Sequence, residues 1–311
     1  MTEETKVTRI QWLDIAKGIA IILMVMGHSG IPGVLAGFIY AFHMPLFFIA
    51  SGLTTQYSPL SVFIKKKSKG LLLPFVIYSA IVLLFKPFVL HKPFGEVLVN
   101  WIKFGWLGSA LWFVPVLFLS LLICWAINKI SNKWVRISFC CLLPILSVLL
   151  KYNDIWLPWN FSTVPYAAFF VLLGSWIRPY SARIISLYKK WYVYILLLAI
   201  TLVISRFWNL GMAWNNCIPI IPITVGALSG TLLVFCLSKL IEDKCRYINK
   251  VFITIGKETF AIMALSQLII QTMNEYLTIP FLVKYTFLVI ILTIIVVVKN
   301  YIINRIKSVP K

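Results

Sequence analysis

Long apolar stretches, separated by short polar segments, make up most of the chain. A transmembrane helix needs about 20 predominantly apolar residues to cross the hydrocarbon core of a bilayer. Ten stretches come close to that length, at residues 11–29, 35–56, 71–90, 107–128, 135–150, 162–178, 191–207, 215–238, 251–273 and 281–303. The pattern predicts an all-α membrane protein, a polytopic bundle of about ten transmembrane helices. Because the connections are short, we expect one domain over residues 1–311, with short tails at 1–10 and 304–311.

The composition agrees with a multi-pass membrane protein. Hydrophobic residues make up 61% of the 311 residues, charged residues make up 12%, and the mean hydropathy is +0.93. Soluble domains are typically about 45–50% apolar and about 25% charged. The six cysteines form no C-x-x-C pair, and most of them lie in apolar stretches. We interpret them as small buried hydrophobic residues and expect neither a metal site nor a disulfide framework.

The formal net charge of +20 is unevenly distributed, and this unevenness predicts the orientation. With a cytoplasmic N-terminus, the ten predicted helices leave 21 lysines and arginines in cytoplasmic segments and six in outer segments. Cytoplasmic loops of membrane proteins carry an excess of Lys and Arg. Both termini are therefore predicted to be cytoplasmic. Since this rule accounts for the basic charge, we expect contact with membrane lipids and no nucleic-acid partner.

The first predicted helix carries three ionisable residues, Asp14, Lys17 and His28, in an otherwise apolar stretch. Such groups are costly in the hydrocarbon and usually face a partner inside the bundle. At about 100° and 1.5 Å per residue, all three lie on one stripe, with Lys17 roughly 16 Å from His28 along the axis. Asp14 and Lys17 are three residues apart and can form an ion pair. A plainer interpretation is that Lys17 extends to the interface and His28 only ends the helix.

A second histidine, His43, lies in the second predicted helix, which a short turn joins to the first. Two histidines at similar depth on neighbouring helices can form one site, and a pKa near neutrality suits histidine to general-base work. The alternative is that His43 is a packed residue bonded to a backbone carbonyl. A zinc site would need further ligands of the right type, so we assign no metal.

A basic run precedes the third predicted helix. Its usual meaning is a topology anchor that attracts anionic lipid, but it can also bind the phosphates of a nucleotide-like cofactor. We assign it to cofactor binding through Lys65, Lys66, Lys67 and Lys69.

Two further residues are candidates for substrate binding, together with His43. Trp112 lies near the outer end of the fourth predicted helix, where it can belong to an interfacial aromatic belt or stack on a sugar ring. Glu258 follows Lys257 at the cytoplasmic start of the ninth predicted helix.

Taken together, these residues resemble the acyltransferase-3 family of integral membrane acyltransferases, and most closely its fucose-4-O-acetylase-like branch. The resemblance rests on residues 12–28, 42–53, 65–74 and 111–118. The family has a basic residue, ten intervening residues and a histidine, which are Lys17 and His28 here. In many relatives the ninth-helix motif ends in histidine, where this chain has Ser266. That difference favours either another acceptor or a position without a chemical role.

The resemblance implies transfer of an acyl group, usually acetyl from cytoplasmic acetyl-CoA, to a hydroxyl of a saccharide in the bacterial cell envelope. It also implies a multi-pass protein of the cytoplasmic membrane. His28 would be the general base. Lys17, held by Asp14, would bind the donor or stabilise its charge.

Two alternatives remain open at this point. A transporter or flippase for a lipid-linked saccharide would also explain ten helices with a polar stripe, but it would not consume acetyl-CoA. A non-catalytic membrane sensor or an inactive relative is the third possibility, and Ser266 is the residue that favours it.

Overall fold

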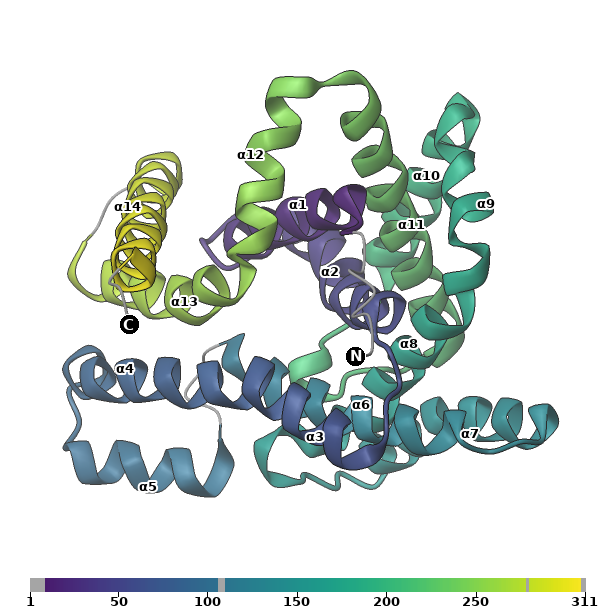
Figure 1. The fold of residues 1–311 in the computed structure, drawn as a ribbon. Coiled ribbons are helices and arrows are strands. Elements are labelled where there is room, and N and C mark those ends of the chain that lie inside the picture. Colours follow the sequence, from purple (N-terminus) through teal and green to yellow (C-terminus); the bar gives the residue numbers. More distant parts are fainter. Residues whose placement is uncertain (1–8, 106–109, 278–279, 309–311) are drawn as a thin grey trace.

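The computed structural model describes residues 9–105, 110–277 and 280–308, and the regular elements in these ranges are helices. Figure 1 shows them arranged as a bundle with α1 and α2 near its middle. The α-helices are α1 (Gln11–Gly27), α2 (Gly33–Thr54), α3 (Leu60–Lys67), α4 (Leu73–Leu90), α5 (Phe94–Phe104), α6 (Phe113–Asn128), α7 (Lys133–Tyr152), α8 (Val164–Ile177), α9 (Ser181–Ile185), α10 (Trp191–Phe207), α11 (Ile220–Lys244), α12 (Arg246–Lys257), α13 (Thr259–Tyr276) and α14 (Phe281–Ser308).

The predicted all-α polytopic bundle is confirmed, since each of the ten predicted apolar stretches contains a helix. Within the described ranges, seven helical segments are long and apolar enough to cross a membrane, or eight if α12 and α13 count as one bent span. Helix α10 is apolar but has only 17 residues. Helix α1 is equally short and carries Asp14 and Lys17. The protein is an integral multi-pass membrane protein, while the count of ten spans stays a prediction.

Three segments differ in shape from their predictions. The third predicted helix begins earlier, because α3, a π-helical turn at Ser68–Leu72 and α4 together form the helical segment Leu60–Leu90. The basic run therefore lies within a helix and not in a loop before it. The ninth predicted helix is bent by 74° between α12 and α13. The connection after α4 contains the amphipathic helix α5, which is fixed in place because its Trp101 packs on Trp159 with ring centroids 5.3 Å apart.

Helix α2 packs against α1, α8, α10 and α11. Its contact with α8 is closest at two glycines. A Cβ atom added to Gly52 would lie 2.1 Å from the Val171 carbonyl oxygen, and one added to Gly174 would lie 2.2 Å from the Ile49 carbonyl oxygen. Small residues allow membrane helices to approach this closely. The crossing fixes the end of α2 that contains Thr54, which lies at the basic cavity described below.

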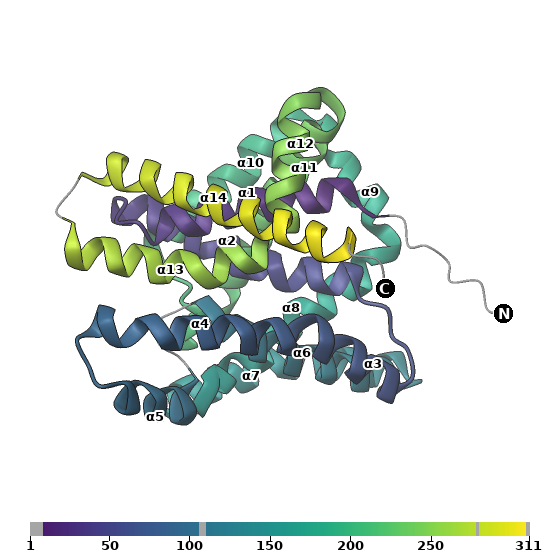
Figure 2. The same cartoon turned by 60° about the vertical axis from the view of Figure 1, so that its left-hand side comes forward.

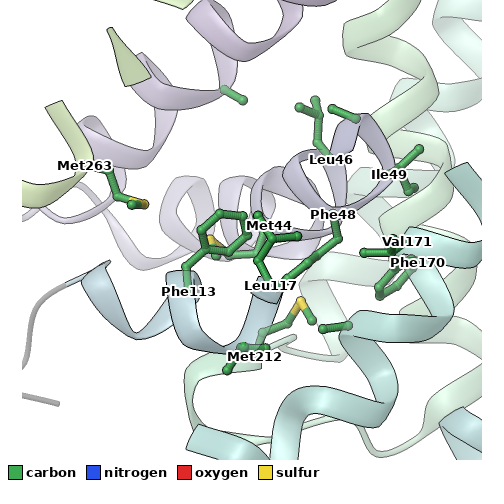
Figure 3. Packing of buried hydrophobic residues seen from close by; sticks show 14 of the residues in the cluster. Met44, Leu46, Phe48, Ile49, Phe113, Leu117, Phe170, Val171, Met212 and Met263 are labelled. Carbon is green, nitrogen blue, oxygen red and sulfur yellow. The ribbon is translucent and has the colours of Figure 1, made fainter. Parts of the chain in front are cut away.

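The hydrophobic core continues from α2 to α6 and α8. Figure 3 shows the α2 side chains packed against residues of both helices, and the rings of Phe48 and Phe113 have centroids 4.7 Å apart. The labelled residues in this region are Met44, Phe48, Ile49, Phe113, Leu117, Phe170 and Val171, and each is at least 91% buried. This packing holds α2 rigidly between the other two helices.

Helix α1 crosses α12 at a second pair of glycines. A Cβ atom on Gly18 would lie 2.4 Å from the carbonyl oxygen of Phe252, and one on Gly256 would lie 1.9 Å from the carbonyl oxygen of Asp14. The two backbones therefore touch at the level of the charged residues of α1. This contact fixes the position of Asp14 and Lys17 in the bundle.

The beginning of α1 and the end of α14 lie at the same end of the bundle (Figure 2). This arrangement agrees with termini on one side of the membrane, and the cytoplasmic assignment of that side stays a prediction. Most of the predicted N-terminal tail, 1–10, and part of the C-terminal tail, 304–311, lie outside the described residues.

Candidate active site

The predicted ion pair on α1 is present. Lys17 Nζ lies 2.8 Å from Asp14 Oδ1, and Arg9 also donates to the Asp14 carboxylate. Asp14 is only 3% exposed. A buried carboxylate is costly unless it is paired and hydrogen-bonded, and two cations satisfy it here. The group as a whole retains one positive charge.

The ion pair lines a cavity of about 380 Å³ that we call the basic cavity. Thr54 at the end of α2 and Arg178 at the end of α8 complete its polar lining with Arg9, Asp14 and Lys17. Arg178 Nη1 donates a hydrogen bond of 3.1 Å to the Thr55 carbonyl oxygen. The polar lining of the basic cavity therefore contains three cationic side chains and one carboxylate.

Two of the four lysines assigned to cofactor binding lie next to this cavity. Lys66 and Lys67 line a neighbouring cavity of about 320 Å³, which shares Thr54 with the basic cavity. Lys67 Nζ donates to Thr55 Oγ1 over 3.1 Å. Lys67 and Arg178 thus both bind Thr55, the first at its hydroxyl and the second at its carbonyl oxygen.

The other two lysines of the run, Lys65 and Lys69, are exposed and line neither cavity. The basic run therefore contains two lysines that line a cavity, of which Lys66 is also exposed, and two that line neither cavity.

The two histidines lie together at the other end of α1, as predicted. His28, His43 and Trp112 line one cavity of about 240 Å³, which we call the histidine cavity. Its other walls come from α1, α2, α13 and the segments before α6 and α11, through Met24, Tyr40, Met44, Ala110, Leu210, Gly211, Met212, Ala213, Trp214 and Gln267. The lining is mostly apolar and aromatic with a few polar groups, which is typical of a small-molecule site.

Hydrogen bonds fix both histidine rings. Tyr40 Oη donates to the Gly27 carbonyl oxygen over 2.9 Å and lies 3.2 Å from His28 Nδ1. His43 is 5% exposed, and its Nδ1 lies 3.0 Å from the Ile39 carbonyl oxygen. Since a carbonyl oxygen only accepts, His43 Nδ1 donates this bond. The alternative for His43, a packed residue bonded to a backbone carbonyl, thus describes its hydrogen bond, yet His43 also lines the histidine cavity.

The segment between α10 and α11 is held against the histidine cavity by side chains that follow α7. Thr163 Oγ1 donates to the Met212 carbonyl oxygen and Asn160 Nδ2 to the Ala213 carbonyl oxygen, each over 2.6 Å. These bonds fix a wall of the cavity that includes Trp214.

Glu258 lies apart from the other residues assigned to substrate binding. It follows α12 and forms an ion pair with Lys299 of α14. It lines another, mostly apolar cavity of about 420 Å³ that is bordered by α1, α12, α13 and α14. The structure does not bring Glu258 together with His43 and Trp112.

Sequence reasoning missed several residues of these cavities. Arg178 is one of the 21 lysines and arginines predicted to be cytoplasmic, and nothing in the sequence indicated that it lines the basic cavity. Tyr40 was not singled out, although it lies three residues before His43 and therefore on the same face of α2.

On α13, the residue at the histidine cavity is Gln267 and not its neighbour Ser266. Ser266 is fully buried, and its hydroxyl has no hydrogen-bond partner among the described residues. Ser266 therefore does not line the histidine cavity.

The described ranges contain no group of three or more His, Cys, Asp or Glu residues that could hold a metal ion. The third histidine, His91, pairs with Glu275 over 3.1 Å at the end of α4. The six cysteines are free, and Cys124, Cys140, Cys217 and Cys236 are buried.

Comparison with known proteins gives one match. A family model described as an acyltransferase domain matches residues 10–303. No curated protein and no solved structure matches the chain.

Proposed function

Because this chain belongs to the acyltransferase domain family, it is a membrane acyltransferase, and we propose that it transfers acetyl from acetyl-CoA to a saccharide hydroxyl. The observation that carries the proposal is the placement of two different cavities along one helix. The basic cavity surrounds Lys17 near the beginning of α1, and the histidine cavity surrounds His28 at its end. The family match gives no support to a transporter or flippase.

The basic cavity suits the donor because acetyl-CoA carries several phosphates. Arginine and lysine bind phosphate through charge-assisted hydrogen bonds, and arginine can do so with two parallel bonds. Arg9 and Arg178 line this cavity, and Lys67 reaches the same threonine as Arg178 from the neighbouring one. We assign the phosphates of the donor to these cations, on the side predicted to be cytoplasmic.

The histidine cavity suits the acceptor and the reacting atoms. The acceptor hydroxyl oxygen attacks the thioester carbonyl carbon, while its proton moves to the Nε2 atom of His28. The carbon–sulfur bond breaks, and the proton then passes from His28 to the departing CoA thiolate. Trp112 and Trp214 present aromatic surface to this cavity, which suits the apolar faces of a sugar ring.

Lys17 lies roughly 16 Å from His28 along α1, at 1.5 Å per residue. The long pantetheine arm of the donor would span this interval, with the phosphates near Arg178 and the thioester near His28. Lys17 is then placed to stabilise the negative charge of the donor, and Asp14 keeps it in position. We further propose that the protein lies in the cytoplasmic membrane and that its acceptor is a cell-envelope saccharide.

The test uses the purified full-length protein in lipid nanodiscs with [¹⁴C]acetyl-CoA and a panel of envelope glycans, followed by mass spectrometry of the acceptors. The proposal predicts an acetyl mass increase on one acceptor, with equimolar release of free CoA. Loss of the acetylated acceptor in the His28→Gln variant would show that the reaction takes place at the histidine cavity. Transfer of a longer acyl group, with no reaction of acetyl-CoA, would contradict the donor assignment.

A further inference from the structure

Tyr40 lies between the two histidines of the histidine cavity. The centroid of its ring is 5.4 Å from the His28 ring and 5.5 Å from the His43 ring. Its hydroxyl oxygen contacts both Gly27 and His28. Helix α1 ends at Gly27, and the last carbonyl groups of a helix have no partner within that helix. Tyr40 therefore caps α1 and touches the proposed base with the same atom.

The number of hydrogens on the Tyr40 hydroxyl oxygen determines which nitrogen of His28 is protonated. A tyrosine hydroxyl has one hydrogen, and it is donated to the Gly27 carbonyl oxygen. The remaining contact of 3.2 Å to His28 Nδ1 must then have the phenol oxygen as acceptor. His28 Nδ1 is consequently the protonated nitrogen. In a neutral imidazole only one nitrogen carries hydrogen, so Nε2 has the free lone pair.

We infer that Tyr40 is a positioning residue that keeps neutral His28 protonated on Nδ1, so that Nε2 is free to accept a proton. The hydrogen bond made by one ring nitrogen decides the state of the other. Catalytic histidines commonly rely on such a third group for their orientation. The Gly27 carbonyl takes the only hydrogen of Tyr40, so the phenol cannot donate to Nδ1 and reverse the assignment.

The same arrangement recurs at the second histidine through a different partner. His43 Nδ1 donates to the Ile39 carbonyl oxygen, so its Nε2 is also the nitrogen without a proton. The Tyr40 ring contacts both imidazoles. The catalytic meaning of this inference rests on the proposed function, but the protonation of His28 does not.

The deciding measurement is ¹⁵N NMR of histidine-labelled full-length protein in lipid nanodiscs, at a pH where the histidines are neutral. The chain has only three histidines, so His43→Gln and His91→Gln assign the spectrum. In the wild type we expect His28 to show a protonated Nδ1 and an unprotonated Nε2. In Tyr40→Phe, which keeps the ring, we expect a population with the proton on Nε2. A wild-type His28 protonated on Nε2, or an unchanged tautomer in Tyr40→Phe, would overturn the inference.

Kinetics provide the second readout. Tyr40→Phe should lower kcat about tenfold, the lower end of the effect known for hydrogen-bond partners of metal-bound histidines, with the KM for acetyl-CoA unchanged. Tyr194→Phe is the matched control, because Tyr194 Oη also donates to a backbone carbonyl, that of Tyr188, over 2.8 Å. It should retain wild-type kcat.

The two proposals can fail separately. A fall in kcat without a change of tautomer, or a change of tautomer without a fall in kcat, would remove the positioning role and leave the proposed function intact. If the wild type transfers no acetyl group, the proposed function fails, and the NMR spectra still decide the role of Tyr40 at His28.

Discussion

Adding one methyl group at Gly256 should separate α1 from α12. The Cβ atom of Gly256→Ala would lie 1.9 Å from the Asp14 carbonyl oxygen and 3.2 Å from the Gly18 nitrogen. Ordinary van der Waals contact begins near 3.4 Å, so the helices must move apart by about 1.5 Å. The atoms in the way belong to the backbone and cannot rotate aside. Overpacking of this kind typically costs about 1–3 kcal/mol, and we expect the upper part of that range.

The assay is thermal unfolding of purified protein in detergent, combined with the KM for acetyl-CoA. Gly256→Ala should unfold at a lower temperature and show a raised donor KM, because the displaced backbone carries Asp14 and thus the basic cavity. Gly95→Ala is the control: it lies in helix α5, and its added Cβ atom would have no atom within 4 Å. Alanine there should be neutral or slightly stabilising, since glycine is unfavourable inside a helix by about 1 kcal/mol. Equal unfolding temperatures for the two variants would refute the close crossing of α1 and α12.

Three further predictions concern the two ends of the bundle. Lys67→Gln should raise the KM for acetyl-CoA, whereas Lys69→Gln, on the exposed side of the same run, should change this KM little. Equal effects of the two variants in correctly inserted protein would show that the run acts only as a topology anchor. Reporter fusions near Asp154 and near Arg183 should give opposite signals, and the same side for both would contradict the ten-span model. Glu258→Gln should leave the KM for the saccharide acceptor unchanged, because Glu258 lies outside the histidine cavity; a raised acceptor KM with wild-type folding would show that the acceptor reaches it.

Much of the fold can be predicted from the sequence because lipid imposes it locally. A helix that crosses the bilayer must satisfy its backbone hydrogen bonds internally and present apolar side chains. Each predicted apolar stretch therefore contains a helix. The spacing of Asp14 and Lys17 within one helix similarly determines their ion pair. A short connection between α1 and α2 is enough to bring His28 and His43 to one cavity.

Contacts between segments far apart in the chain could not be predicted from the sequence. The bend between α12 and α13 depends on how α12 lies across α1, where Gly18 and Gly256 meet. Arg178 follows Lys17 by more than 150 positions, and no periodicity relates them. Glu258 was assigned to substrate binding together with His43, yet it pairs with Lys299 and lines a different cavity.

The role of His28 as general base can be tested by one kinetic measurement, the kcat of His28→Gln in lipid nanodiscs. Glutamine keeps similar size and hydrogen bonding but has no useful basicity. A general base typically contributes about 10²–10⁴-fold to the rate, so kcat should fall at least about a hundredfold, or roughly 2.7 kcal/mol at 1.36 kcal/mol per decade. The unfolding temperature should match that of the wild type, because His28 lies at the end of α1. A correctly folded variant with near-normal kcat would contradict acyl transfer by general-base catalysis at this histidine.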